Sequence, residues 1–233
     1  MANIVITGCS RGIGYYVVQR LCSSNHKVIG ISRSGEKLKE LTSYLPNNLF
    51  EGIVFDLNNI TNECNKLQEI ISSHFSIVDI LINNAGILIN KSLISIEEDD
   101  IQSMFSTNTL APFFLSKIIL PLMENSGYKH IVNIGSMGGV QGSSKYEGLG
   151  WYSATKSTMA TLTECMAKEW KIFNVKINYL ALGAVNTEML EEAFPGYKAP
   201  VDADEMADFI VEFALNGHRY FNGKIIPVSI SNP

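Results

Sequence analysis

Several common functional signatures are missing from this chain. Its four cysteines occur singly, without the C-x-x-C spacing of metal or redox sites, so we predict neither a disulfide framework nor a zinc site. The four histidines are equally dispersed, and we expect no metal. Lysine and arginine form no cluster, and the formal net charge is -5. A nucleic-acid partner is therefore not expected.

Long uninterrupted apolar runs are also missing. The most apolar stretch, 112–123, contains Lys117 and two prolines and is too short for a membrane span. The chain enters a strand-like run at Asn3, without the basic and apolar regions of a signal peptide. We therefore predict a cytoplasmic protein with no membrane partner, which acts on a small molecule.

The pattern that is present is a regular alternation of strands and helices. Short runs rich in Val and Ile predict buried strands at 3–6, 27–31, 52–55, 78–82, 130–134, 176–180 and 224–228. Helical periodicity occupies 12–23, 36–44, 61–75, 97–124, 152–173 and 203–215. This alternation predicts an α/β fold: a doubly wound, Rossmann-type parallel sheet of about seven strands with helices on both faces. No linker or repeat divides the chain, so we expect a single domain over 1–233.

A glycine-rich turn follows the first predicted strand. Glycines 8, 12 and 14 lie where the strand turns sharply into a helix, which allows close approach of a ligand to the backbone. The amides at the helix N-terminus and the helix dipole favour a pyrophosphate. The alternative is that the glycines only shape the turn. The candidate cofactor-binding residues of this turn are Gly8, Ser10, Arg11, Gly12, Ile13 and Gly14.

The end of the second predicted strand bears no acidic residue. NAD enzymes of this fold place Asp or Glu there against the ribose 2′-hydroxyl, whereas this chain has Arg33. A guanidinium at that point, assisted by Arg11 and the Ser34 hydroxyl, would bind a 2′-phosphate. The sequence therefore favours NADP(H) over NAD(H). Alternatively, Arg33 is an ordinary solvated side chain.

Two further strand ends carry candidate cofactor contacts. Asp56 closes the third strand, where it could accept a hydrogen bond from adenine beside the Leu57 amide, or cap the following segment. The four residues after the fourth strand, Asn83, Asn84, Ala85 and Gly86, could approach the cofactor or connect neighbouring strands.

A tyrosine and a lysine are spaced to share one face of a helix. Tyr152 and Lys156 stand at i and i+4 at the start of the predicted helix 152–173. A tyrosine hydroxyl ionises near pH 10, and a neighbouring ammonium favours its ionised form. The pair could therefore move a proton, although the same spacing on a helix commonly forms only a surface pair.

Taken together, these motifs resemble the short-chain dehydrogenase/reductase family. The resemblance covers most of the chain and rests on the order of six separate places: Thr7 to Gly14, Asp56, Asn83 to Gly86, Asn108, Ser136 with Tyr152 and Lys156, and Gly183 to Thr187.

This resemblance implies a division of labour among the candidate catalytic residues. Tyr152 would donate a proton to a carbonyl oxygen, or remove one from an alcohol, while Ser136 orients that oxygen. Lys156 would bind the nicotinamide ribose and tune Tyr152, and Asn108 would hold a water that links the lysine to solvent. Alternatively, Asn108 marks a structural break, since it precedes Pro112 in an otherwise apolar helix. Gly183, Val185 and Thr187 would contact the cofactor near the nicotinamide. The resemblance also implies a homodimer or homotetramer.

Three segments depart from the family pattern. Leu182 stands where the family usually has proline, the segment 137–151 is longer than usual, and the segment 188–200, where the family commonly has a lid, is short. We expect an NADP(H)-dependent oxidoreductase acting on a carbonyl or alcohol of the 3-oxoacyl, sugar, steroid or small-ketone type. The alternatives are a cofactor-binding regulator without turnover and a structural protein with an idle pocket.

Overall fold

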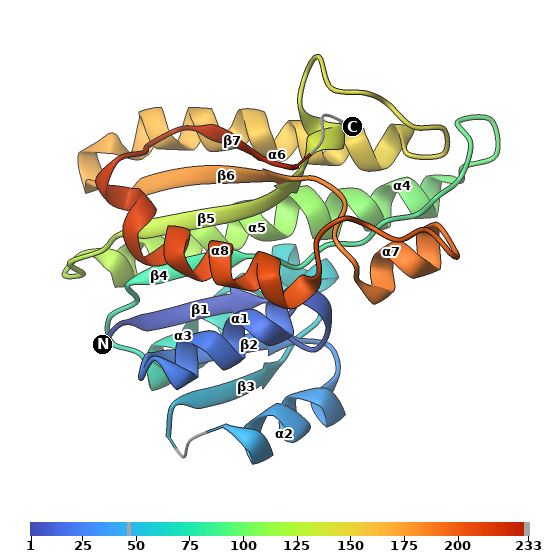
Figure 1. Cartoon of the computed structure of the whole chain (residues 1–233). Coiled ribbons are helices and arrows are strands. Elements are labelled where there is room, and N and C mark those ends of the chain that lie inside the picture. Colours follow the sequence, from blue (N-terminus) through green and yellow to red (C-terminus); the bar gives the residue numbers. More distant parts are fainter. Residues whose placement is uncertain (46–47, 231–233) are drawn as a thin grey trace.

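One parallel sheet forms the centre of the molecule, whose computed structural model describes residues 1–45 and 48–230 (Figure 1). The sheet has the strand order β3-β2-β1-β4-β5-β6-β7, and all neighbouring strands run parallel. The strands are β1 (Asn3–Thr7), β2 (Lys27–Ser32), β3 (Phe50–Val54), β4 (Ile80–Asn83), β5 (His130–Ser136), β6 (Lys176–Leu182) and β7 (Ile225–Val228). The order changes direction between β1 and β4, which confirms the predicted doubly wound sheet.

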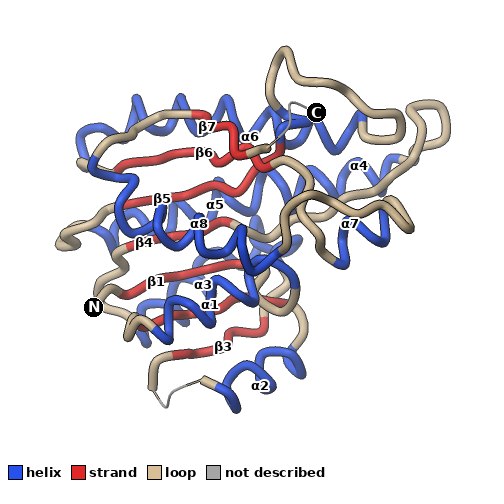
Figure 2. Tube along the Cα trace, viewed as in Figure 1, coloured by secondary structure: helices blue, strands red, loops and turns tan. Residues whose placement is uncertain are grey.

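Helices cover both faces of this sheet (Figures 1 and 2). They are α1 (Gly12–Ser23), α2 (Gly35–Tyr44), α3 (Ile60–His74), α4 (Glu98–Phe105), α5 (Ala111–Ile119), α6 (Gly150–Glu169), α7 (Glu188–Ala193) and α8 (Ala203–Asn216). Helices α1, α2 and α8 lie on one face, and α3, α5 and α6 lie on the other. Helix α7 stands beyond the carboxyl ends of the strands, together with the loops that follow β4 and β5.

Two apolar cores result from this layering. Val5 in β1 packs into the core beneath α3, α5 and α6, whereas its neighbours Ile4 and Ile6 pack into the core beneath α1 and α8. All three side chains are fully buried. Burial on both faces explains why the strands read as continuous apolar runs rather than alternating ones.

The helix predicted over 97–124 is interrupted. A π-helical turn, Ser106–Leu110, separates α4 from α5, and a short 3₁₀ segment, Leu120–Met123, follows. Pro112 lies in the first turn of α5, where its missing N–H removes one helical hydrogen bond. The π turn carries Asn108 into the protein interior, and such turns often occur at functional sites.

Other differences are small. The helix predicted at 152–173 begins at Gly150, and its last residues, Trp170–Phe173, form a 3₁₀ turn. Helix α7 was not predicted, because it has only six residues. All four cysteines are free thiols, as predicted. Within the described ranges, no helix has the length and apolar character needed to cross a membrane.

Candidate active site

The turn after β1 requires its glycines. Gly8 and Gly12 have positive φ angles of 68° and 56°. A Cβ atom on Gly8 would lie 2.7 Å from the Ala85 Cα, and one on Gly14 would lie 2.3 Å from the Gly8 carbonyl oxygen. A side chain at either position would therefore displace the backbone.

The N-terminus of α1, next to this turn, has no side-chain cap. Arg11 occupies the N-cap position, but its side chain does not cap the helix, and the first turn of α1 contains no acidic residue. The first amides of a helix without a cap retain their capacity to bind an anion, and the helix dipole adds to it. The turn therefore fits the phosphate groups of a dinucleotide.

The side chain of Asn84 holds the turn together. Its amide nitrogen donates to the carbonyl oxygens of Thr7 (3.1 Å) and Gly8 (2.9 Å). In return, the Thr7 hydroxyl accepts from the backbone amides of Asn84 (3.1 Å) and Ala85 (3.0 Å). Asn83 donates instead to Asn133 Oδ1 (2.8 Å), deeper in the sheet. Both asparagine side chains thus connect strands, and a direct cofactor contact from either stays a prediction.

The candidate residues after β2 and β3 lie at the same edge. Arg33 is exposed directly after β2, and it forms no ion pair with any described residue. Ser34 caps α2 by accepting from the Lys37 amide (3.3 Å). Asp56 accepts from the Asn58 amide (3.0 Å), which is the capping role considered from the sequence, and Leu57 beside it is buried.

Ser136, Tyr152 and Lys156 meet at the carboxyl end of β5. The Ser136 side chain lies close enough to Tyr152 to act on its pKa, and the Ser136 Oγ accepts from the Gly138 amide (3.2 Å). The Lys156 Nζ lies 5.8 Å from the centroid of the Tyr152 ring and donates to the Ile134 carbonyl oxygen (3.1 Å). The structure thus brings together the three side chains that were predicted to act together.

Asn108 approaches this group from the π turn. Its Oδ1 accepts from the Ile87 amide (2.9 Å), and its Nδ2 donates to the Ile87 carbonyl (2.9 Å) and to the Thr155 hydroxyl (3.1 Å). A Cβ atom on Gly86 would lie 3.3 Å from both the Asn108 Oδ1 and the Lys156 Nζ. Asn108, Gly86 and Lys156 therefore converge, with the asparagine held in one orientation.

Tyr179 in β6 was missed by the sequence analysis. Its hydroxyl accepts from the Ser136 amide (3.1 Å) and donates to the Lys156 carbonyl (3.0 Å). Its ring is fully buried and leaves no room for a Cβ atom on Gly135. The only signal in the sequence was an aromatic residue with a polar end in the middle of a predicted strand.

Burial controls the ionisation of the central pair. It raises the pKa of Tyr152 to about 12, although the hydrogen bond with Ser136 acts in the opposite direction. Burial also lowers the pKa of Lys156 to about 8. The structure therefore does not show the expected lowering of the tyrosine pKa by the ammonium. At neutral pH the phenol keeps its proton and is able to donate it.

The segment after β6 covers the glycine-rich turn. The Gly183 amide donates to the Val228 carbonyl (2.9 Å), and Val185 is buried. Thr187 caps α7 by accepting from the Leu190 amide (3.2 Å), and a Cβ atom on Gly12 would lie 3.4 Å from the Thr187 Cγ2. The candidate residues of this segment therefore lie next to those of the turn.

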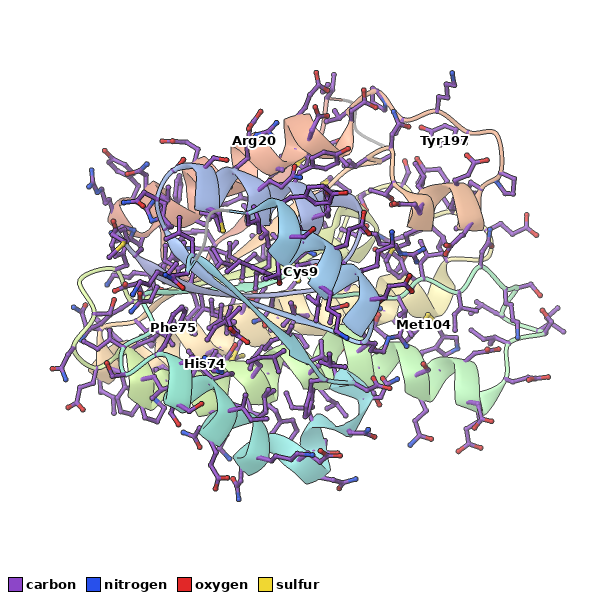
Figure 3. The ribbon with its side chains drawn as sticks, turned by 90° about the horizontal axis from the view of Figure 1, so that it is seen from below. Cys9, Arg20, His74, Phe75, Met104 and Tyr197 are labelled. Atoms are coloured by element: carbon purple, nitrogen blue, oxygen red, sulfur yellow. The ribbon has the colours of Figure 1, made fainter. Side chains whose placement is uncertain are left out.

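An open pocket of about 720 Å³ lies along α7. Its lining includes Thr187, Glu188, Leu190 and Lys198, and it also includes Tyr197 on the outer loop after α7 (Figure 3). The Tyr197 side chain is half exposed. The short segment 188–200, where a lid is expected from the family resemblance, therefore lines this pocket, and we refer to it as the lid.

The long segment between Ser136 and Tyr152 is folded on itself. The Lys145 Nζ donates to the carbonyl oxygens of Gly138 (2.9 Å) and Val140 (2.7 Å). Farther along, the Gly148 carbonyl accepts from the Lys91 amide (3.1 Å) in the loop after β4. The segment is thus a folded loop that is attached to the loop after β4.

Known proteins are similar to this chain in both sequence and fold. The family model for short chain dehydrogenases matches residues 2–198. A 3-oxoacyl-[acyl-carrier-protein] reductase of Buchnera aphidicola (subspecies Baizongia pistaciae) is 34% identical over 79% of this chain and 74% of its own. The solved structure of ElxO with NADP bound is 28% identical, with a TM-score of 0.83 over 98% of both chains. A 3-ketoacyl-(acyl-carrier-protein) reductase from Brucella melitensis, complexed with NADH, has the same fold (TM-score 0.85, 20% identity, 98% of this chain and 96% of its own).

The match of the family model spans the glycine-rich turn, the π turn with Asn108, and the cluster of Ser136, Tyr152 and Lys156. The seven-stranded parallel sheet agrees with the fold of the solved structures along nearly the whole chain. The chain therefore belongs to the short-chain dehydrogenase/reductase family of oxidoreductases.

Proposed function

We propose that this protein is an NADP(H)-dependent oxidoreductase that interconverts a carbonyl compound and its alcohol. The observation that carries the proposal is the convergence of Ser136, Tyr152 and Lys156 at the sheet edge that also holds the glycine-rich turn. A bound nicotinamide would supply or accept the hydride. Side chains of this chain would transfer the proton and orient the substrate oxygen.

Tyr152 is the proposed proton donor for reduction. Its raised pKa keeps the phenol protonated at neutral pH, so the hydroxyl can pass its proton to the substrate oxygen as that oxygen gains negative charge. The Ser136 hydroxyl, which lies beside Tyr152, would hold the same oxygen. Lys156 lies close enough to stabilise the resulting phenolate, and its charge is anchored by the Ile134 carbonyl. In the oxidative direction each proton transfer is reversed.

The preference for NADP(H) is proposed from the charges at the strand ends. Arg33 is exposed and unpaired within the described residues directly after β2, and Ser34 lies beside it. A guanidinium there favours a 2′-phosphate over a free hydroxyl. The NADP complex of ElxO supports this preference, whereas the NADH complex of the Brucella reductase supports the alternative.

The substrate class, assembly and location are also proposals. The 34% identical relative supports a 3-oxoacyl substrate, and sugars and small ketones are the other candidates. A homodimer or homotetramer is supported by apolar side chains that remain exposed after α6, such as Ile172, which is 84% exposed. We place the protein in the cytoplasm on the sequence expectation given above.

The substitution Tyr152→Phe tests the proposed chemistry. Because it removes only the phenol oxygen, we expect at least about a hundred-fold loss of NADPH-dependent turnover on a panel of 3-oxoacyl, sugar and ketone substrates. NADPH affinity, measured by the fluorescence of the reduced nicotinamide, should remain within about two-fold. Tyr146→Phe, in the loop before α6, is the matched control and should keep full activity. Undiminished turnover in Tyr152→Phe would refute the assignment, and tight NADPH binding without turnover in the unaltered protein would favour the regulator.

The substitution Arg33→Ala tests the cofactor preference. The variant would lose a charge-assisted hydrogen bond to the 2′-phosphate. We therefore expect NADPH affinity to weaken about ten- to a hundred-fold, while NADH affinity stays nearly unchanged. Lys39→Ala removes an exposed charge from α2 and serves as the control. If the ratio of NADPH to NADH affinity is the same in Arg33→Ala as in the unaltered protein, the 2′-phosphate proposal is wrong.

A further inference from the structure

The side chain of Arg11 already holds an anion. Its two terminal nitrogens contact both carboxylate oxygens of Glu192, at 2.5 Å (Nη1 to Oε1) and 3.2 Å (Nη2 to Oε2). Paired contacts of this kind are the geometry in which a guanidinium also binds a phosphate. Glu192 thus presents to Arg11 the chemical group that a cofactor phosphate would present.

This ion pair joins the glycine-rich turn to the lid. Arg11 stands between Ser10 and Gly12 in the turn, and Glu192 lies in the last turn of α7. The two ends of the contact are 181 residues apart in the sequence. The first residues of α7 also stand over the turn, since a Cβ atom on Gly12 would lie 3.5 Å from a Glu188 carboxylate oxygen. The lid is therefore attached to the place where a dinucleotide would bind.

The pair is open to solvent. The exposed fractions of the two side chains are 51% for Arg11 and 62% for Glu192. Exposed ion pairs contribute little to stability and are weakened by salt, so an incoming anion of higher charge can displace one partner. The 2′-phosphate of NADP(H) is such an anion, because it carries more charge than a carboxylate and offers three acceptor oxygens. The pyrophosphate carries two charges, one on each of its phosphates.

We infer that Glu192 controls cofactor binding: its carboxylate occupies Arg11 in place of a cofactor phosphate and must be displaced when the dinucleotide binds. The inference rests on the proposed function, because it requires a dinucleotide at the glycine-rich turn. Glu192 lowers the affinity for whichever phosphate Arg11 contacts, and its displacement releases the lid from the turn. Arg33 has no such internal partner among the described residues, so its preference for NADP(H) does not depend on displacing a carboxylate.

Glu191 provides a matched control on the same helix. Its Oε1 accepts from the Gly196 amide (3.0 Å), and no described cation pairs with it. Glu191→Gln therefore removes the same charge from α7 as Glu192→Gln, while Arg11 keeps its partner. A general effect of the charge of the lid will appear in both variants, whereas competition for Arg11 will appear only in Glu192→Gln.

The test compares three ligands at low ionic strength: NADPH, NADH and adenosine 2′,5′-bisphosphate. Affinities are measured by calorimetry for the unaltered protein and for the single variants Glu192→Gln, Glu191→Gln and Arg11→Ala. They are also measured for the double variant that combines Arg11→Ala with Glu192→Gln. We expect Glu192→Gln to bind NADPH about two- to five-fold more tightly, as an exposed pair allows. This gain should vanish in the Arg11→Ala background and be absent from Glu191→Gln.

The ligands identify the phosphate that competes. Tighter binding of NADPH and of the bisphosphate, with NADH unchanged, assigns the 2′-phosphate to Arg11. An equal gain for NADPH and NADH assigns the pyrophosphate, and either result supports the inference. Unchanged affinities in Glu192→Gln, or an equal gain in Glu191→Gln, overturn the inference, while NADPH-dependent turnover by the unaltered protein still upholds the proposed function. If the unaltered protein binds neither dinucleotide, both fail.

Discussion

The hydroxyl of Tyr179 joins the backbones that carry two of the candidate catalytic residues. It accepts from the Ser136 amide at the end of β5 and donates to the Lys156 carbonyl in α6. Both partners are far from Tyr179 in the sequence, and the side chain of Tyr179 is fully buried. One buried oxygen therefore sets the spacing between the strand that presents Ser136 and the helix that presents Tyr152.

We expect Tyr179→Phe to disturb this spacing without changing the cofactor site. The Ser136 amide would lose its partner, at a cost of about 1–3 kcal/mol in the free energy of unfolding. Turnover should fall about ten-fold, because Ser136 and Tyr152 are no longer held at a fixed distance, while NADPH affinity stays within about two-fold. Tyr220→Phe, at a 78% exposed position, is the control. A destabilised variant with unchanged turnover would show that Tyr179 serves stability alone.

At the residue scale, the pKa values of Tyr152 and Lys156 also differ from those expected from their spacing. The spacing of Tyr152 and Lys156 was predicted from one helical turn, and the structure places them together. Their ionisation was not predictable in the same way, because the pKa values depend on how much protein surrounds each group. Burial is a property of the packed molecule and cannot be read from an i, i+4 spacing.

At the scale of elements, the turn between β1 and α1 is the most constrained feature. Its glycines combine positive φ angles with close backbone contacts, and Asn84 connects it to the end of β4. The positions of Gly8, Gly12 and Gly14 were sufficient to predict the turn. The support from Asn84 was considered as an alternative, and its geometry required the sheet order that places β1 beside β4.

We expect Gly8→Ala to damage both stability and cofactor binding. A non-glycine residue at a φ of 68° costs about 1–2 kcal/mol, and the contact of its Cβ with the Ala85 backbone adds to this cost. The thermal unfolding midpoint should fall by several degrees, and NADPH affinity should weaken at least about ten-fold. Gly127→Ala is the control, because nothing lies within 4 Å of its Cβ position. Equal behaviour of the two variants would show that the turn tolerates a side chain.

At the scale of the whole molecule, the two edges of the sheet have different chemistry. The carboxyl edge collects the candidate site, whereas the amino edge holds His130 at the start of β5, fully buried. The His130 Nδ1 contacts the Ala214 carbonyl (2.9 Å) and its Nε2 contacts the Asn178 amide nitrogen (3.1 Å). One ring nitrogen must therefore donate and the other accept, so the neutral ring is the form that fits.

This arrangement predicts a stability that depends on pH. Burial lowers the pKa of His130 from 6.5 to about 4. The unfolded chain therefore takes up the proton first as the pH falls, and the stabilisation, complete above about pH 6.5, is lost between pH 6.5 and 4. The loss amounts to at most about 3 kcal/mol. Urea unfolding between pH 7.5 and 4.5 should show a steeper decline for the unaltered protein than for His130→Gln. Parallel curves would contradict the prediction.

The chain by itself determined the order of strands and helices, the glycine-rich turn and the helix face that Tyr152 and Lys156 share. These features depend on residues that are close in the sequence. They can therefore be predicted from the hydrophobic periodicity and from the positions of the glycines. That the whole chain forms a single domain stays a prediction, as do the roles of the individual site residues.

Only the tertiary structure decided which groups complete the site. It set Tyr179 between Ser136 and Lys156, and it gave Arg11 a partner in Glu192. Each of these contacts joins residues far apart in the chain or depends on burial. Such contacts exist only after the sheet and its helices have packed, and no local pattern in the sequence encodes them.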